Sequence, residues 1–519
     1  MAGLESERLD GPSSSHRHRR LDIAMVSDYF YPNVGGVESH IYILSQKLIQ
    51  RGHKVIVVTH HYGNRCGIRH LPAGLKVYHI PMGTLPFSST AATVPNMFSA
   101  LPLIRSILLR EKIQILHAHQ ALSSIGLEAT MHAKTLQIGI RTIFTDHSLF
   151  GLGGGGWAEV SGNKIVKGIL SDIDSVICVS HTGKENTVLR AMLNPDIVYV
   201  IPNAIVADSF QPDRNKSRYS GGPCMYTSPS DPSPFYVLEN HPTEIWFLGD
   251  PWKPTYHLVT IVCVSRLAYR KGIDLLIAAI PKLCQKHPTI RFLIGGTGPK
   301  LIELEQMREK FQTVIKPDQV KILGPIRADQ VRNLMIQGDI FLNASLTEAF
   351  GMTLLEAACT GLLVVSTRVG GIPEVLPEGL IEFAEPEVDD LVQATERAIK
   401  VIQSGTHDPQ KVHERVRGMY SWTDVAARTE HVYYEAFKIE PAPLIERFRR
   451  YERPESTLSL SPELFSYFGS GSIFGKVMCI VVMCQYIFMG FLDWWMPRDQ
   501  IDYAPDFNYD AYVQAYGSD

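Results

Sequence analysis

The sequence predicts an α/β protein with two Rossmann-like domains that face one another, followed by one C-terminal transmembrane helix. Short apolar segments alternate with segments of helical length in two series, one from residue 21 and one from residue 258. Polar and glycine-rich residues often follow the apolar segments directly. Near the C-terminus, a roughly 20-residue apolar span is long enough to cross a bilayer. The alternation favours parallel sheets that bind ligands at the carboxyl ends of their strands.

Length and composition exclude several classes of protein. A chain of 519 residues, 45% hydrophobic and 20% charged, is too long for one ordinary domain and can fill two cores. The formal net charge of -3 and the lack of a basic, aromatic-interleaved stripe indicate no nucleic-acid partner. The eight cysteines include no CxxC pair and no cluster with histidines at metal-ligand spacing, so we expect a reduced protein without structural zinc.

The N-terminal series predicts a first domain over residues 21–213. Residues 1–20 are polar and lack the apolar core of a secretory signal, so they are expected to form a disordered tail. Gly35 and Gly36 precede the first helix directly, which brings bare amides close to a phosphate or sugar. His147 ends the strand-like segment RTIFTDH and is expected in the same cleft, although a lone histidine is usually structural.

Residues 214–257 differ from both series. They are rich in Pro, Ser, Gly and Tyr and have no periodicity, which predicts a disordered insertion between the domains. Their isolated aromatic residues leave a docking surface open as an alternative, and translated non-coding sequence is another.

The second series predicts a nucleotide-sugar domain over residues 258–420. Arg266 and Lys271 in SRLAYRKG follow its first strand, where two cations could neutralise a leaving diphosphate without a metal; a solvated basic turn is the alternative. Gly295 and Gly296 form a glycine turn whose N–H groups can face anions. Residues 421–440 are expected to form a helix that crosses back to the first domain, because its Trp and Tyr side chains need a surface to bury.

Glu348 and Glu356 stand eight positions apart across the start of an expected helix. If the whole interval were helical, the two backbones would lie about 12 Å apart, which suits the two ends of a nucleotide-sugar. One carboxylate can accept hydrogen bonds from the hexose and the other from the ribose, and Gly351 leaves room for the ligand. An amphipathic helix with solvent-facing glutamates stays open as an alternative.

The C-terminal apolar segment, residues 473–495, predicts a single transmembrane helix if Lys476 reaches the interface. Gln485 is its only polar interior residue, and Trp494 and Trp495 supply an aromatic anchor. Basic residues precede the segment and mainly aspartates follow it, so the domains are expected in the cytosol and residues 496–519 in the lumen. A buried core helix is the alternative.

Seven motifs together carry a family resemblance. In chain order they are PNVGGVESH, FTDHS, VIPNAI, SRLAYRKG, GGTGP, EAFGMTLLE and STRVGGIPEV. Their order resembles that of the two-domain GT-B retaining glycosyltransferases with the E-x7-E signature, over about residues 21–437. More narrowly, MVSDYFYPNVGGVESHIY, HTGKENTVLR, YRKGIDLL, SLTEAF and STRVGGIPEVLPE, with the membrane helix, resemble the catalytic subunits of phosphatidylinositol N-acetylglucosaminyltransferase.

The resemblance implies transfer of N-acetylglucosamine from UDP-GlcNAc to phosphatidylinositol, with retention of configuration. This is the first step of glycosylphosphatidylinositol (GPI) anchor synthesis, on the cytosolic face of the endoplasmic reticulum, in a multisubunit membrane complex. No cofactor and no metal are expected. The implied roles are the diphosphate for Arg266 and Lys271, the ribose for Glu356, the sugar for Glu348 and His147, and the donor phosphate for Gly35 and Gly36.

Two other functions remain open at this point. The E-x7-E and Arg/Lys motifs do not select the acceptor, so a GT-B enzyme with another sugar or lipid acceptor is one alternative. A non-catalytic scaffold of a membrane complex is the other, although the set of site residues argues against it. The insertion at 214–257 departs from the short interdomain loop of the family and puts unimpeded domain closure in doubt.

Overall fold

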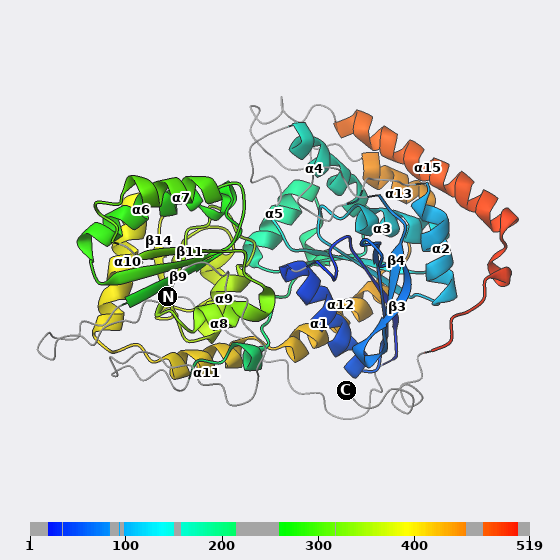
Figure 1. Ribbon diagram of the computed structural model, residues 1–519. Helices are drawn as coiled ribbons and strands as arrows, with labels where there is room; N and C mark the ends of the chain where they lie inside the picture. Colours follow the sequence, from blue (N-terminus) through cyan, green and yellow to red (C-terminus); the bar gives the residue numbers. More distant parts are fainter. Residues whose placement is uncertain are drawn as a thin grey trace, which may run out of the picture.

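A computed structural model describes residues 19–33, 35–83, 93, 98–149, 157–213, 259–316, 318–452 and 471–506. The predicted insertion at 214–257 and nearly all of the predicted N-terminal tail therefore lie outside the described residues. Within them, two α/β domains stand side by side (Figure 1), each with a sheet between layers of helices.

The first domain contains an eight-stranded sheet in the order β3-β4-β2-β1-β5-β6-β7-β8, parallel throughout except for the antiparallel β3–β4 pair. Its strands are β1 (Asp22–Val26), β2 (Lys54–His60), β3 (Gly67–Leu71), β4 (Leu75–Ile80), β5 (Ile115–His119), β6 (Arg141–Asp146), β7 (Ser175–Cys178) and β8 (Val198–Val200). Its helices are α1 (Gly36–Gln50), α2 (Ala100–Arg110), α3 (Ser124–Leu136), α4 (Trp157–Leu170) and α5 (His181–Ala191). The central strands are runs of Val and Ile because helices cover both faces of the sheet.

The second domain contains a six-stranded parallel sheet in the order β11-β10-β9-β12-β13-β14. Its strands are β9 (Val259–Val264), β10 (Ile290–Gly295), β11 (Val320–Gly324), β12 (Ile340–Asn343), β13 (Leu363–Thr367) and β14 (Ile381–Ala384). Its helices are α6 (Ile273–Lys286), α7 (Leu301–Lys310), α8 (Val331–Met335), α9 (Met352–Cys359), α10 (Val388–Gln403) and α11 (Pro409–Met419).

Both sheets confirm the predicted doubly wound α/β class. In each, the strand order reverses direction once, between β1 and β5 in the first domain and between β9 and β12 in the second. A crevice forms at such a reversal, outside the carboxyl ends of the two strands, because the helices that follow them lie on opposite faces of the sheet. The topology therefore places a ligand site after β9 and β12 and another after β1 and β5.

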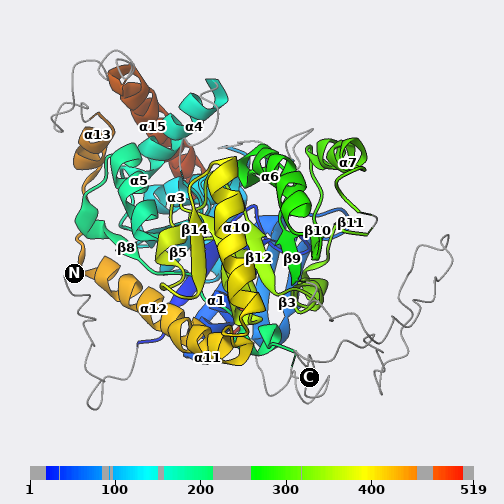
Figure 2. The ribbon, with the colours of Figure 1, turned by 90° about the vertical axis from the view of Figure 1, so that its left-hand side faces the viewer.

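Helix α12 (Trp422–Lys438) leaves the second domain and packs along α1 of the first (Figures 1 and 2). Trp422 and Tyr433 are buried there, in one core cluster with Ile23 and Met25 of β1. The amphipathic face of this helix thus finds its apolar partner in the first domain, which ties the end of the second domain to the first.

The start of α9 falls between the two glutamates, as the sequence predicts. α9 begins only at Met352, so Glu348 lies in the loop before the helix and Glu356 lies within it. The estimate of about 12 Å for an all-helical interval does not apply. Gly351, with φ of 93°, occupies the left-handed region at the N-cap, and this turn separates the two glutamates into different elements.

The apolar C-terminal segment forms α15 (Gly471–Trp495), long and apolar enough to cross a membrane by length and composition. It lies against the first domain, beside α13 (Leu444–Glu452), α3, α4 and α2 (Figures 1 and 2). One stripe of the helix is buried: Met478, Val482, Gln485, Met489 and Leu492. The opposite stripe is exposed and includes Ile480, Ile487 and Trp494.

Polar side chains attach α15 to the first domain. Gln485, the polar residue inside the apolar segment, is fully buried and accepts a hydrogen bond of 3.3 Å from Thr135 of α3. At the far end of the helix, Asp493 forms an ion pair of 2.7 Å with the fully buried Arg105 of α2. Such directional contacts, made by groups that are costly to bury alone, define one docked position of the helix.

The described start of the segment that follows α15, residues 496–506, contacts the N-terminal part of the chain. The Ala504 N–H donates to the Arg110 carbonyl at 2.9 Å, and Asp506 forms an ion pair of 3.0 Å with Arg20. Arg110 belongs to α2 of the first domain, and Arg20 directly precedes that domain. The lumenal position of residues 496–519 stays a prediction.

Candidate active site

The loops after β9 and β12 meet at the strand-order reversal of the second sheet. Lys271, at the end of a short 3₁₀ turn (Tyr269–Lys271), donates through Nζ to Oε1 of Glu348. The Ser345 hydroxyl donates to the same carboxylate oxygen at 3.1 Å. Two residues 77 positions apart thus form one charged pair, and both retain some solvent exposure for a ligand.

Gly272 explains why these two loops can approach so closely. Its φ is 65°, and a Cβ at this position would lie 1.7 Å from the Ala344 carbonyl oxygen. Only glycine fits both the left-handed conformation and the contact. The Leu346 N–H also donates to the Arg270 carbonyl at 2.9 Å, so the backbone itself joins the Lys271 loop to the Glu348 loop.

Glu356 is in a different electrostatic state from Glu348. It lies half-buried in α9, and no hydrogen bond or ion pair engages its carboxylate within the part of the chain that the structure describes. Burial without a compensating partner raises the pKa of Glu356 to about 7. A carboxylate in this state is ready to accept hydrogen bonds from hydroxyl groups of a ligand.

The N-terminus of α1 faces this site from the first domain. A Cβ on Gly36 would lie 3.9 Å from Met352 at the start of α9, so the two helix starts are neighbours across the interdomain boundary. Glu38 folds back over Gly35: a Cβ on that glycine would lie 2.5 Å from a Glu38 carboxylate oxygen. Burial raises the pKa of Glu38, and the positive charge of the exposed Arg266 lowers it in part.

A carboxylate therefore occupies the helix N-terminus where the sequence predicts the donor phosphate. Helix N-termini attract anions through their free N–H groups and their dipole, and Glu38 supplies that anion in this structure. A phosphate bound to Gly35 and Gly36 requires Glu38 to turn away. Arg266, which has no ion pair among the described residues, lies close enough to act on Glu38 and to receive such an anion.

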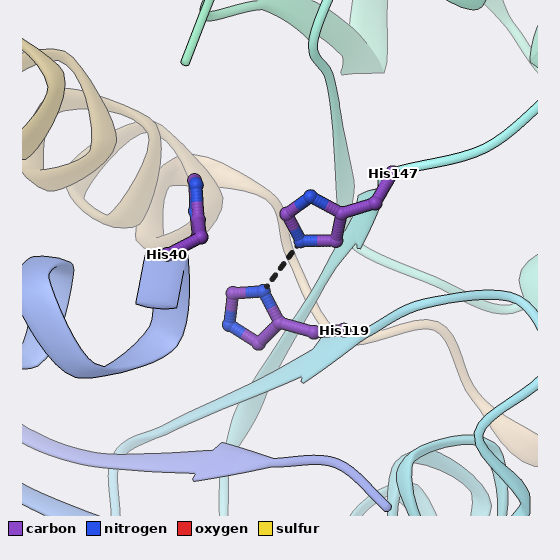
Figure 3. A group of neighbouring side chains, drawn as sticks. All are labelled: His40, His119 and His147. Carbon is purple, nitrogen blue, oxygen red and sulfur yellow. Dashed lines mark hydrogen bonds between the residues drawn. The ribbon is translucent and has the colours of Figure 1, made fainter. Parts of the chain in front are cut away.

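His147 belongs to a group of three histidines from distant parts of the sequence (Figure 3). His40 comes from α1, His119 from the end of β5, and His147 from the residue after β6. His119 Nδ1 and His147 Nε2 lie 3.2 Å apart, and the His40 and His147 ring centroids lie 4.6 Å apart. The ring nitrogens of the three lie within 4.8 Å of one another, a spacing that could hold a metal ion.

The three imidazoles are neutral near pH 7. Burial lowers the pKa of His40 to about 4 and holds the pKa values of His119 and His147 well below their usual range, assisted by the neighbouring imidazoles. His40 donates through Nδ1 to the Asn203 side-chain oxygen at 2.8 Å, which leaves its Nε2 as an acceptor. His147 can therefore exchange hydrogen bonds with a ligand, but it carries no fixed positive charge.

A second set of contacts holds the two domains together beside Glu348. The Glu374 carboxylate, from the second domain, accepts from the N–H groups of His181 and Thr182 at the start of α5, at 2.6 and 2.8 Å. The Ser180 hydroxyl donates to the Ala349 carbonyl at 2.7 Å. An acidic residue at a helix N-terminus is favourable, so these contacts close the boundary directly next to the Glu348 loop.

The predicted glycines have distinct positions. A Cβ on Gly296, whose φ is 139°, would lie 1.9 Å from the Ser265 carbonyl oxygen, and its N–H donates to the Gly324 carbonyl at 2.7 Å. This amide is therefore not directed at an anion, contrary to the expectation. Gly295 ends β10 and faces Ile326, while Gly351 is the N-cap of α9 and lies beside Leu354. These glycines allow close backbone packing around the site.

Sequence reasoning missed several residues of this boundary. His40, His119 and Asn203 join the His147 group, and Glu374 and Thr182 join the domains. His119 ends the segment IQILHAH as His147 follows RTIFTD, so the strand-end signal could have found it. Nothing in the local pattern marks the others, because each acquires its neighbours only when elements distant in the sequence pack together.

Comparisons with known proteins agree with this geometry. Residues 60–154 match the family model described as PIGA (GPI anchor biosynthesis), and residues 259–401 match glycosyl transferases group 1. A phosphatidylinositol N-acetylglucosaminyltransferase gpi3 subunit of Schizosaccharomyces pombe is 45% identical over 93% of this chain and 92% of its own.

A Homo sapiens protein, also named as a subunit of phosphatidylinositol N-acetylglucosaminyltransferase, is 46% identical over 94% of this chain and 88% of its own. Among solved structures, sucrose-phosphate synthase from Thermosynechococcus elongatus has a TM-score of 0.60 at 19% identity, covering 81% of this chain and 100% of its own. At that identity the likeness concerns the fold alone, which is GT-B.

Proposed function

The chain belongs to the family of these phosphatidylinositol N-acetylglucosaminyltransferase subunits, and on that basis we propose that it transfers N-acetylglucosamine to phosphatidylinositol. It is a glycosyltransferase of the GT-B fold. The reaction is the first step of GPI-anchor biosynthesis. The donor is UDP-GlcNAc, and the anomeric configuration is retained.

One observation carries the proposal: Lys271 and Glu348 pair where the strand order reverses in the second sheet, and Glu356 lies in α9, the helix that follows the Glu348 loop. Arg266 and Lys271 bind the UDP diphosphate, and their two positive charges balance the charge that develops on the leaving group. Glu356 accepts hydrogen bonds from the ribose, and Glu348 accepts from the sugar.

The first domain supplies the other side of the site. Gly35 and Gly36 line the cleft at the donor phosphate, and His147 contacts the sugar as a neutral hydrogen-bonding group. In the transfer, an inositol hydroxyl oxygen bonds to the sugar C1 while the C1–phosphate oxygen bond breaks. UDP leaves on the face from which the hydroxyl attacks, and the hydroxyl proton passes to the leaving phosphate. The two-carboxylate arrangement of glycoside hydrolases is not used.

The chain acts as one component of a larger complex, since its relatives are named as subunits. We place this complex in the membrane of the endoplasmic reticulum, with both α/β domains on the cytosolic face and α15 as the membrane anchor. The exposed apolar stripe of α15 and the tryptophan pair Trp494 and Trp495 support a membrane contact.

The decisive test is an activity assay. Membranes from cells that lack the native enzyme and express this chain should transfer radiolabelled N-acetylglucosamine from UDP-GlcNAc to phosphatidylinositol. Label from another nucleotide-sugar, or on another lipid, would favour a GT-B enzyme of different specificity. If the complex assembles but transfers no label with the chain intact, the chain is a scaffold and the proposal is wrong.

Glu356 gives the proposal a pH signature. Its raised pKa of about 7 means that the carboxylate form, which accepts from the ribose, is lost as the pH falls below 7. We expect UDP affinity, measured by calorimetry, to fall about tenfold from pH 8 to pH 6. The Glu356→Gln protein should bind UDP more weakly at pH 8. Its UDP affinity should vary less with pH, because only the ionisation of UDP itself then depends on pH. Equal pH dependence in both proteins would contradict the ribose assignment.

A further inference from the structure

A cavity of about 610 Å³ lies beside the first half of α15, on the side of the first domain opposite the candidate active site. Arg141, which lines it, is the first residue of β6, whereas His147 directly follows the last residue of that strand. Six residues of extended chain span about 20 Å. The cavity is therefore separate from the site that binds the donor.

The walls of this cavity are strongly basic. Six cationic side chains line it against three acidic ones, namely Lys134, Arg141, Lys164, Lys167, Arg447 and Arg450 against Asp172, Asp174 and Glu440. Two of the acids already pair with cations: Asp174 with Lys134 at 2.6 Å, and Asp172 with Arg447 and, at 3.7 Å, with Arg450. The surplus of positive charge favours an anionic occupant.

Arg141 is a largely buried cation on the wall of this cavity. The residue is only 8% exposed, and its Nε is buried without a hydrogen-bond acceptor among the described residues. Its guanidinium lies over the Phe437 ring, 5.8 Å from the ring centre. A ring in this position does not accept a hydrogen bond from an N–H group that points along the guanidinium plane. Because this Nε is closed off from solvent, an anion in the cavity has to contact the terminal nitrogens of the guanidinium, and a guanidinium fits phosphate or carboxylate oxygens well.

The remaining wall comes from the membrane anchor. Phe474, Gly475, Met478 and Tyr486 of α15 line the cavity, while Ile480 and Ile487 of the same helix face outward. Figure 1 shows α15 and α13 together on the outer flank of the first domain. A basic pocket beside an apolar helix at a membrane surface suits a molecule with an anionic head and an apolar tail. Its volume falls within the range of small-molecule sites.

We propose that this cavity binds a phosphate-bearing anion, with its phosphate at Arg141 and Arg450, and that the source is the headgroup of an anionic glycerophospholipid. The acyl chains then lie along α15. The site is distinct from the acceptor position of the transfer reaction and does not depend on the proposed activity. Its role is to fix the first domain and α15 in one position at an anionic membrane surface.

The test uses the full-length chain, purified in detergent with the subunits that accompany it, and a photoactivatable phosphatidylserine, which cannot serve as an inositol acceptor. Crosslinks mapped by mass spectrometry are expected on the cavity wall around Phe474 and Met478. Excess phosphatidylserine should abolish them, and excess phosphatidylcholine should not. If millimolar inorganic phosphate competes as well as the lipid, the cavity binds phosphate but the occupant is a soluble anion, which overturns the lipid source.

A matched pair of variants on α13 makes the test specific. Arg450 lines the cavity, whereas the neighbouring Arg449 does not and pairs with Glu446 on the surface. We expect Arg450→Gln to reduce crosslinking about tenfold and Arg449→Gln to leave it unchanged. Arg141→Gln should reduce it further, with an unchanged thermal midpoint as its folding control. Equal yields from the two α13 variants, or crosslinks elsewhere on the chain, would overturn the proposal.

Discussion

Lys271→Ala and Arg266→Ala are each expected to lower kcat by on the order of 100-fold or more, because each removes a charge that stabilises the leaving diphosphate. The matched control is Arg270→Ala, which removes an exposed cation from the same turn. It should retain near-normal activity. Steady-state transfer assays on membranes with equal amounts of each variant measure the difference.

The same assay decides whether a metal takes part. Since the two cations replace a metal in the proposed mechanism, EDTA should leave the rate unchanged. The EDTA experiment is needed because His40, His119 and His147 are spaced closely enough to bind a metal ion. Strong inhibition by EDTA that magnesium, manganese or zinc reverses would show that the electrostatic assignment is wrong.

The contact between Lys271 and Glu348 allows a further test, which is whether the effects of the two substitutions on activity are independent. Because the two side chains pair directly, removing one changes the environment of the other, and their effects should not add. The double variant Lys271→Ala/Glu348→Gln is expected to be less impaired than the product of the two single effects. Strict multiplicativity would mean that the pair does not act as a unit during turnover.

Glu348→Gln and Glu356→Gln are expected to differ in kind. Contacts to the transferred sugar can strengthen in the transition state, whereas ribose contacts bind ground and transition states alike. Glu348→Gln should therefore lower kcat by about 100-fold, and Glu356→Gln should mainly raise the KM for UDP-GlcNAc. Both replacements keep the side-chain shape, so a loss of folding is not the expected cause. The reverse pattern would exchange the two roles.

Much of the site could be read from the sequence because its signals are local. Gly272 and Gly351 adopt left-handed conformations that mark tight turns, and Lys271 and Glu348 lie in the loops that follow the apolar strands β9 and β12. In a parallel sheet these strand ends share one edge, which is why the sequence predicted that both residues serve the same ligand; their direct pairing was not predicted. The same reasoning correctly predicted two doubly wound sheets.

The length of α9 was not predictable from spacing. Two glutamates eight positions apart fit either a continuous helix or a loop followed by a helix, and periodicity does not distinguish these two structures over so short an interval. The left-handed turn at Gly351 decides the matter by starting the helix at Met352. Glu348 is thereby free to meet Lys271 from a loop, a pairing that the all-helical estimate did not describe.

The sequence by itself determined the α/β class, the strand ends that carry Lys271, Glu348 and His147, and the apolar length of α15, because each depends on neighbouring residues. Only the tertiary structure decided which distant groups meet. His40 of α1 meets His147 at the end of β6, Glu374 caps α5 of the other domain, and Gln485 of α15 accepts a hydrogen bond from α3. Such contacts depend on the packing of whole elements against one another, which no local pattern of residues encodes.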